Sequence, residues 1–201
     1  GSGVVVMTRP TANAIVGNDV RHANGGIFVG GSRSYVARTV VVGTDRGMVA
    51  YATQTTYEHN VLYENEVGFV ASTVVPSNRV VANDFVGNDR HATAGPGPLR
   101  IYTADGRGNY WEGAYDLSGD SGARTLDRAY SPTDDLDRRL HRTDAAVTLS
   151  AAPTVRGLRA FRGTTPGFRK ASIIDLAPLT RPANPDRLAQ ARNETSVEGP
   201  A

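Results

Sequence analysis

The segment Gly26-Ile27-Phe28-Val29 gives the clearest indication of the fold, because its pattern of one glycine followed by three mostly apolar residues returns at a nearly fixed interval. The pattern also occurs at Gly3-Val4-Val5-Val6, Gly47-Met48-Val49-Ala50 and Gly68-Phe69-Val70-Ala71, with spacings of 23, 21 and 21 residues. An internal repeat of this length with apolar columns is typical of a solenoid, in which each repeat forms one coil that stacks on the next.

Other columns keep register with the glycine. Six positions before it stand the apolar residues Val20, Val41, Leu62 and Phe85, and eleven before it stand Ile15, Val36, Tyr57 and Val80. Eight before it stand the polar residues Asn18, Thr39, Asn60 and Asn83. The last member of each column requires a two-residue insertion near Val75-Pro76. We therefore predict an all-β fold, a right-handed parallel β-helix of about four coils, whose asparagine column lies at a bend and bonds from coil to coil.

The periodicity also divides the chain. We expect the β-helix coils over residues 1–104, an irregular or helical C-terminal cap over 105–182, and a flexible tail over 183–201. Within the cap, Ile173-Ile174-Asp175-Leu176 is expected to form a short strand. A β-helix that begins abruptly at Gly3 would leave an unpaired edge, so we expect either a fragment of a longer chain or an edge covered by a partner.

The composition narrows the chemistry. With no cysteine, the chain has neither a disulfide framework nor a thiolate metal site. Its 22 basic and 20 acidic residues give a net charge of +2 and do not cluster, which disfavours nucleic acid as a partner. No apolar stretch reaches the roughly 20 residues needed to span a bilayer. No nucleotide-binding loop or serine nucleophile motif is present.

One acidic column is a candidate catalytic site. Two positions before the glycine stand Asn24, Asp45, Glu66 and Asp89. Stacked coils are about 4.8 Å apart, so the carboxylates would form a ladder of like charges. A bound cation, a raised pKa or a sugar-cleaving acid pair would each relieve the repulsion. Alternatively the position is an exposed turn, in which the acids reach into water beside Arg46 and Arg90.

A second acidic stretch has the spacing of a calcium loop. Asp116, Ser118, Asp120 and Asp127 fall at loop positions one, three, five and twelve. The usual glycine at position six is Ser121, and position twelve is Asp instead of Glu, which shortens the reach for bidentate binding. Calcium is therefore a candidate ligand of Asp116, Asp120 and Asp127, and the alternative is an ordered surface turn.

Several segments downstream of the coils, taken in order, carry a family resemblance. They are Gly108-Asn109-Tyr110-Trp111, Asp127-Arg128-Ala129-Tyr130-Ser131-Pro132 and the run from Ile173 to Pro182. Together with the coils they resemble the NosD family, extracytoplasmic β-helix accessory proteins of nitrous-oxide reductase maturation in the carbohydrate-binding and sugar-hydrolase repeat superfamily. The resemblance implies a periplasmic or cell-surface location, copper as the associated metal, and protein partners that include an ABC transporter.

Three functions remain open. The first is a non-enzymatic NosD-like protein that docks its partners in copper-centre maturation. The second is a carbohydrate-binding or carbohydrate-active β-helix, a polysaccharide hydrolase, lyase or epimerase, that uses Asp45, Glu66 and Asp89. The third is a generic surface solenoid. A copper site built wholly from the coils is disfavoured, because His22, His59 and His91 occupy different columns.

Overall fold

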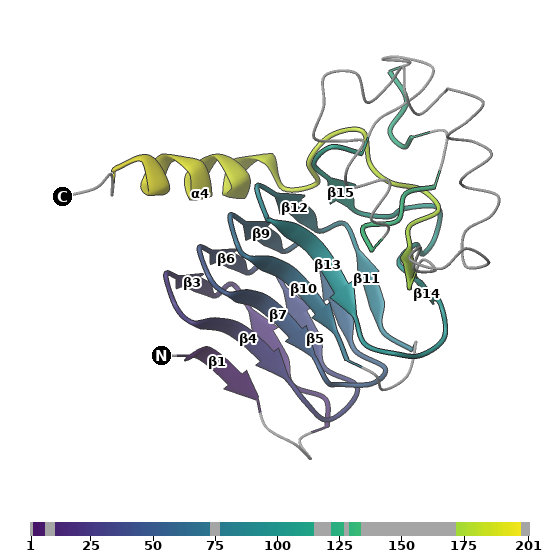
Figure 1. The fold of residues 1–201 in the computed structure, drawn as a ribbon, viewed down its shortest axis with the longest axis horizontal. Coiled ribbons are helices and arrows are strands. Elements are labelled where there is room, and N and C mark those ends of the chain that lie inside the picture. Colours follow the sequence, from purple (N-terminus) through teal and green to yellow (C-terminus); the bar gives the residue numbers. More distant parts are fainter. Residues whose placement is uncertain are drawn as a thin grey trace, which may run out of the picture.

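The computed structural model describes residues 2–6, 11–72, 77–114, 122–126, 129–133 and 172–197. The expected parallel β-helix is confirmed, since short strands from successive coils stack in parallel into three sheets (Figure 1). The first sheet contains β1 (Ser2–Val6), β4 (Gly25–Val29), β7 (Arg46–Ala50), β10 (Val67–Ala71) and β13 (Arg90–Ala94). The second contains β2 (Ala14–Val16), β5 (Tyr35–Ala37), β8 (Thr56–Glu58) and β11 (Arg79–Val81). The third contains β3 (Asp19–Arg21), β6 (Val40–Val42), β9 (Val61–Tyr63), β12 (Asp84–Val86) and β15 (Tyr110–Trp111).

The pairing register follows the columns read from the sequence. In the first sheet, Phe69 of β10 pairs with Met48 of β7 on one side and with Ala92 of β13 on the other. The offset is thus 21 residues on one side and 23 on the other. The two-residue insertion is therefore real. The third sheet continues beyond the expected end of the coils at residue 104, because β15 pairs with β12.

The interior is filled by the predicted apolar columns. In the columns six and eleven positions before the glycine, Val41, Leu62, Val36 and Tyr57 are at most 1% exposed. Aromatic rings close the C-terminal end of the core, where Phe85 stacks on Trp111 with ring centroids 4.1 Å apart and planes 8° from parallel. Burial of this apolar surface is the main stabilising contribution to the coils.

The glycine column exists because the coils approach closely at that position. A Cβ atom on Gly26 would lie 2.1 Å from the carbonyl oxygen of Gly47, and one on Gly47 would lie 2.5 Å from that of Gly68. In the last coil His91 stands at the position of the glycine, and the centroid of its ring lies 6.3 Å from that of Trp111. The glycine therefore repeats because a side chain at this position would clash with the backbone of the next coil.

The expectation of a flexible tail after residue 182 is wrong for residues 185–197. They form the helix α4 (Pro185–Val197), which runs back along the third sheet toward the N-terminal coils (Figure 1). Leu188 and Ala191 are at most 2% exposed and pack on valines of the third sheet. The valines are Val40, Val42, Val61 and Val86. Packing buries apolar surface of both α4 and the third sheet, and this burial stabilises the helix. The sequence of the segment is only weakly amphipathic and so does not by itself indicate a helix.

A two-stranded parallel ribbon lies beyond the coils. The strand β14 (Arg100–Ile101) pairs with β16 (Ile173–Ile174), as the sequence predicted for Ile173 and Ile174. Tyr130 and Asp175 form an additional antiparallel bridge. The ribbon thereby joins the C-terminal segment to the last coil.

Candidate functional site

The polar column at the first corner forms a ladder of hydrogen bonds along the stack. Thr39 N donates to Asn60 Oδ1 at 3.1 Å, and Asn60 Nδ2 donates to Asn83 Oδ1 at 2.9 Å. Asn83 Nδ2 in turn donates to Asn109 Oδ1 at 2.9 Å. The coil-to-coil bonding predicted for this column is present, and each buried amide is satisfied by its neighbours.

Two further ladders were missed in the sequence. At a second corner Asn65 Nδ2 donates to Asn88 Oδ1 at 2.9 Å, and Thr44 Oγ1 donates to Asn65 Oδ1 at 2.7 Å. A third corner is bonded through Asn13, Ser34, Thr55 and Asn78. Both columns are legible at a fixed distance from the glycine. The residues at equivalent positions are Ser, Thr or Asn, so the columns are recognised by a shared ability to form hydrogen bonds and not by a repeated residue type.

Asp175 ends the first ladder. Its Oδ2 accepts hydrogen bonds from Asn109 N at 2.7 Å and from Trp111 Nε1 at 2.8 Å. Its Oδ1 accepts from Thr103 Oγ1 at 2.7 Å and from Ala177 N at 3.1 Å. This carboxyl group is fully buried, and burial raises its pKa, opposed by the donors that favour the charged form. Asp175 thus connects the coils to the C-terminal segment.

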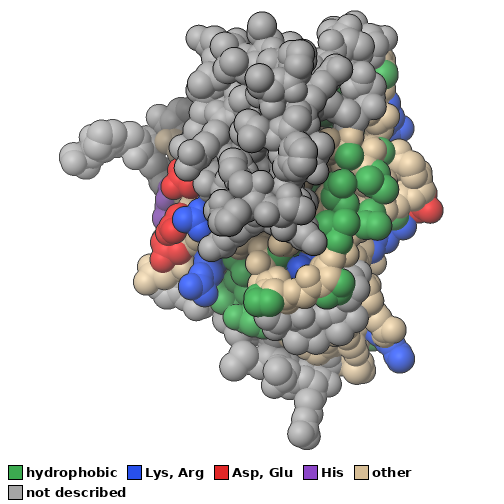
Figure 2. Space-filling view, turned by 45° about the vertical axis from the view of Figure 1, so that its right-hand side comes forward, with side chains coloured by type: hydrophobic (Ala, Val, Ile, Leu, Met, Phe, Trp, Pro, Cys, Tyr) green, Lys and Arg blue, Asp and Glu red, His purple; other side chains and the backbone are tan. Residues whose placement is uncertain are grey.

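An apolar surface covers the outer side of the β14–β16 ribbon. Exposed and buried side chains alternate along both strands, with Arg100 and Ile173 facing the interior. Leu99, Ile101 and Leu176 are 47%, 51% and 52% exposed, which is unusual for large apolar side chains. We name Leu99, Ile101, Ile174 and Leu176 the apolar ribbon face. Figure 2, which brings the right-hand side of Figure 1 with β14 forward, shows a patch of hydrophobic side chains on this face of the molecule.

The start of α4 is held by a buried carboxylate. Asp84 accepts hydrogen bonds from Ala183 N at 2.6 Å and from Asn184 N at 2.8 Å. Burial raises the pKa of Asp84 to about 6, against the lowering effect of these donors. Asn184 Nδ2 donates to Ala82 O and Asp84, which turns Asn184 Oδ1 toward His59 Nδ1 at 3.2 Å. His59 Nδ1 therefore carries the hydrogen.

The proposed acidic column lies on the surface. Asp45, Glu66 and Asp89 are all exposed, at the turns that lead into β7, β10 and β13. Their backbone groups join the coil-to-coil bonding, since Glu66 N donates to Thr44 O and Asp89 N to Asn65 O. The structure thus places them where the sequence allowed an exposed turn, and whether they act on a ligand stays a prediction. Asp116, Asp120 and Asp127, the expected calcium ligands, lie outside the described residues.

The described part of the chain therefore defines a class of protein: a parallel β-helix with polar corner ladders and a C-terminal segment that closes one end. The family "Periplasmic copper-binding protein (NosD)" matches residues 1–117, and the chain belongs to this family.

Two curated relatives carry the name "Probable ABC transporter binding protein NosD". The protein of Stutzerimonas stutzeri is 27% identical over 143 residues, which are 70% of this chain and 32% of that protein. The protein of Pseudomonas aeruginosa (strain PAO1) is 28% identical over 124 residues, which are 62% of this chain and 29% of that protein. The chain thus spans about a third of the length of these relatives.

The family description raises the question of where copper would bind. In the residues that the structure describes, no group of three or more His, Asp or Glu side chains could hold a metal ion. His91 Nε2 lies 2.7 Å from the carbonyl oxygen of Glu112, and burial lowers the His91 pKa. Met48 is 1% exposed in the core. These described donors do not fit a copper site, and His141 and Met7 lie outside the described residues.

No helix in the described ranges is long and apolar enough to cross a membrane.

Proposed function

We propose that this chain is the partner-docking part of an extracytoplasmic, non-enzymatic NosD-like protein that serves copper-centre maturation of nitrous-oxide reductase together with an ABC transporter. Membership of the NosD family and the names of the two relatives support an extracytoplasmic role beside an ABC transporter. The observation that carries the docking role is the apolar ribbon face, with Ile101 51% exposed on a strand whose other side is buried. Exposed apolar patches on rigid elements are typical of protein interfaces.

The ribbon is well suited to present such a surface. Ser131 Oγ donates to Ile173 O at 2.8 Å, and the Arg100 guanidinium donates to Ser72 O at 2.8 Å. Arg100 is 3% exposed, so its charge is buried and held by carbonyl groups beneath the ribbon. Rigid support of this kind lowers the entropy lost when a partner binds.

The test measures binding of the purified chain to nitrous-oxide reductase and to the ABC transporter of the same organism, by biolayer interferometry. Ile101→Glu places a charge in the apolar ribbon face and is expected to weaken binding at least tenfold. Tyr51→Glu is the matched control, because Tyr51 is equally exposed at 52% but follows β7. It should bind like the wild type, as should the double variant Asp45→Asn, Glu66→Gln.

The same double variant separates docking from the carbohydrate alternative. If the acidic column acts on a polysaccharide, a screen of anionic polysaccharides will give products or binding that the double variant loses. That result, or unchanged partner binding by Ile101→Glu, would contradict the docking proposal. Metal analysis of protein from copper-supplemented cells then decides whether the chain itself carries copper.

A further inference from the structure

A basic pocket lies where the first corner of the coils meets the C-terminal segment. It has a volume of about 290 Å³. One wall comes from the corner residues His59 and Ala82, and another from the strap 179–183 that leads into α4. The pocket holds three arginines, namely Arg181 of the strap and Arg107 and Arg124 of two other segments.

The charge of this pocket is one-sided. No Asp or Glu is among the described residues that line it. Two described acids close to the lining residues along the chain bond elsewhere, since Asp105 pairs with Arg79 at 2.8 Å and Asp84 binds the backbone at the start of α4. Arg107 and Arg124 form no ion pair with any described residue. Within the described part of the chain, no acidic side chain compensates the positive charges of Arg107 and Arg124.

The walls of the pocket are fixed by backbone bonds. Arg107 N donates to Ala104 O at 3.0 Å, which closes the tight turn before β15. Arg124 O accepts from Thr180 N at 3.1 Å, which ties the segment of Arg124 to the strap. The corner is tied as well, since Ala82 N donates to Gly108 O at 2.8 Å. The guanidinium groups thus start from fixed backbone positions, which lowers the entropic cost of gathering them around one ligand.

We propose that this pocket binds a small oxyanion, a phosphate or a carboxylate compound, with Arg107 and Arg124 as its principal ligands. Guanidinium groups recognise both chemistries through paired N–H donors. The volume admits a free anion of a few heavy atoms and is at the small end of ligand pockets. The site is separate from the apolar ribbon face, and the proposal does not depend on the docking role.

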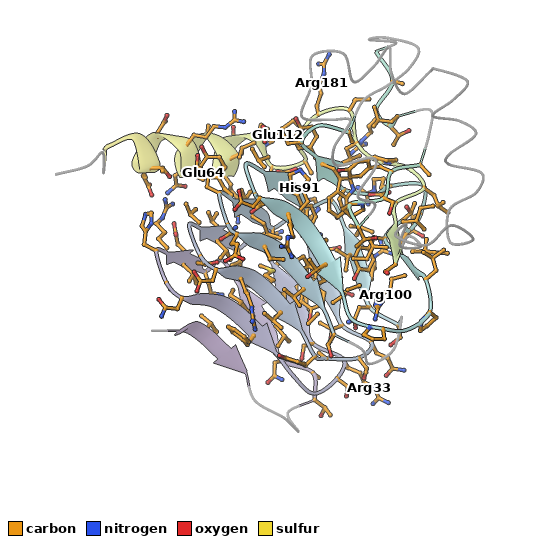
Figure 3. The ribbon with its side chains drawn as sticks, in the orientation of Figure 1. Arg33, Glu64, His91, Arg100, Glu112 and Arg181 are labelled. Atoms are coloured by element: carbon orange, nitrogen blue, oxygen red, sulfur yellow. The ribbon has the colours of Figure 1, made fainter. Side chains whose placement is uncertain are left out.

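The test uses inorganic phosphate and citrate as probes, titrated by calorimetry into the full chain in chloride buffer at constant ionic strength. Saturable binding of either anion is expected, and Arg107→Gln with Arg124→Gln should weaken it at least tenfold. Arg33→Gln is the matched control, since Arg33 is also exposed and lies at the opposite end of the molecule from Arg181 (Figure 3). Circular dichroism confirms that each variant is folded.

Three results would overturn the proposal. The first is that neither anion gives a saturable signal with the wild type. The second is that the Arg107→Gln, Arg124→Gln variant binds as tightly as the wild type while remaining folded. The third is that Arg33→Gln weakens binding as much as the pocket variant, which would indicate a general effect of net charge.

Discussion

Asp175 stacks on Asn109 in the same way as Asn109 stacks on Asn83 in the coil before it. Asn83 N donates to Asn109 Oδ1 at 3.2 Å, and Asn109 N donates to Asp175 Oδ2 at 2.7 Å, although Asp175 comes 66 residues later in the chain. An asparagine in the ladder needs acceptors for its amide hydrogens, and Asn109 Nδ2 finds one in Val80 O at 2.9 Å. A carboxylate has no hydrogen to donate and accepts from every side, so it suits the last position of the ladder.

Replacing Asp175 by Asn should destabilise the fold. The new NH₂ group must face either Thr103 Oγ1 and Ala177 N or Asn109 N and Trp111 Nε1, all of which donate to the carboxylate. Unsatisfied buried donors cost about 1–3 kcal/mol each. We expect a loss of about 2–4 kcal/mol in the free energy of unfolding, measured by urea denaturation. An Asp175→Asn midpoint equal to that of the wild type would contradict the assigned role.

Gly108 should tolerate no side chain, because of the same carboxylate. A Cβ atom on Gly108 would lie 1.8 Å from Asp175 Oδ1. Gly108→Ala therefore has to displace the buried carboxyl group, and we expect a loss of more than about 3 kcal/mol. Urea denaturation followed by tryptophan fluorescence suits the measurement, because Trp111 is bonded to Asp175.

Gly106→Ala is the control for this substitution. It has a φ of +69° and nothing within 4 Å of an added Cβ atom, so only the backbone conformation opposes alanine there. That cost is about 1–2 kcal/mol. Equal losses for the two variants would mean that the contact with Asp175 does not limit residue 108.

Asp84 should make stability depend on pH between about 4 and 6. Its pKa is about 6 in the folded chain and near 3.9 in an unfolded one, so the folded state binds more protons in this interval. The contribution of Asp84 to the free energy of unfolding is complete below its pKa in the unfolded chain, and it is lost as the pH rises through about 6. Asp84→Asn should remove this slope, a relative change on the order of 2–3 kcal/mol in the free energy of unfolding.

The matched control for Asp84 is Asp186, an exposed acid in the first turn of α4. Asp186→Asn should keep the pH slope of the wild type, as read from urea midpoints at several pH values. Parallel profiles for Asp84→Asn and the wild type would show that burial does not raise the Asp84 pKa.

The coils were predictable because their interactions repeat. Gly26 and Gly47 lie at the same close approach, and Val41 and Leu62 fill the same interior column, so one steric rule appears several times in the sequence. The two additional ladders follow the same period, but Ser, Thr and Asn share the role at those corners.

The C-terminal segment could not be predicted in this way, because each of its contacts occurs once. Asp175 is placed by Asn109 and Trp111, which no spacing rule connects to it. The helix α4 buries few apolar residues, and its stability comes from the third sheet. A local signal was present nonetheless, since Asn184-Pro185-Asp186 has the residue preferences of a helix start.

Phe69 lies 21 residues from its pairing partner in one neighbouring coil and 23 from its partner in the other, so the coils differ in length. Between β10 and β11 the chain gains two residues, yet Val80 still pairs with Tyr57 and the corner bonds resume unchanged. The corner hydrogen bonds therefore align each new coil with the previous one, whatever the number of residues between two corners. A length change at this corner is absorbed before the next strand begins, so coils of unequal length can share one continuous interior.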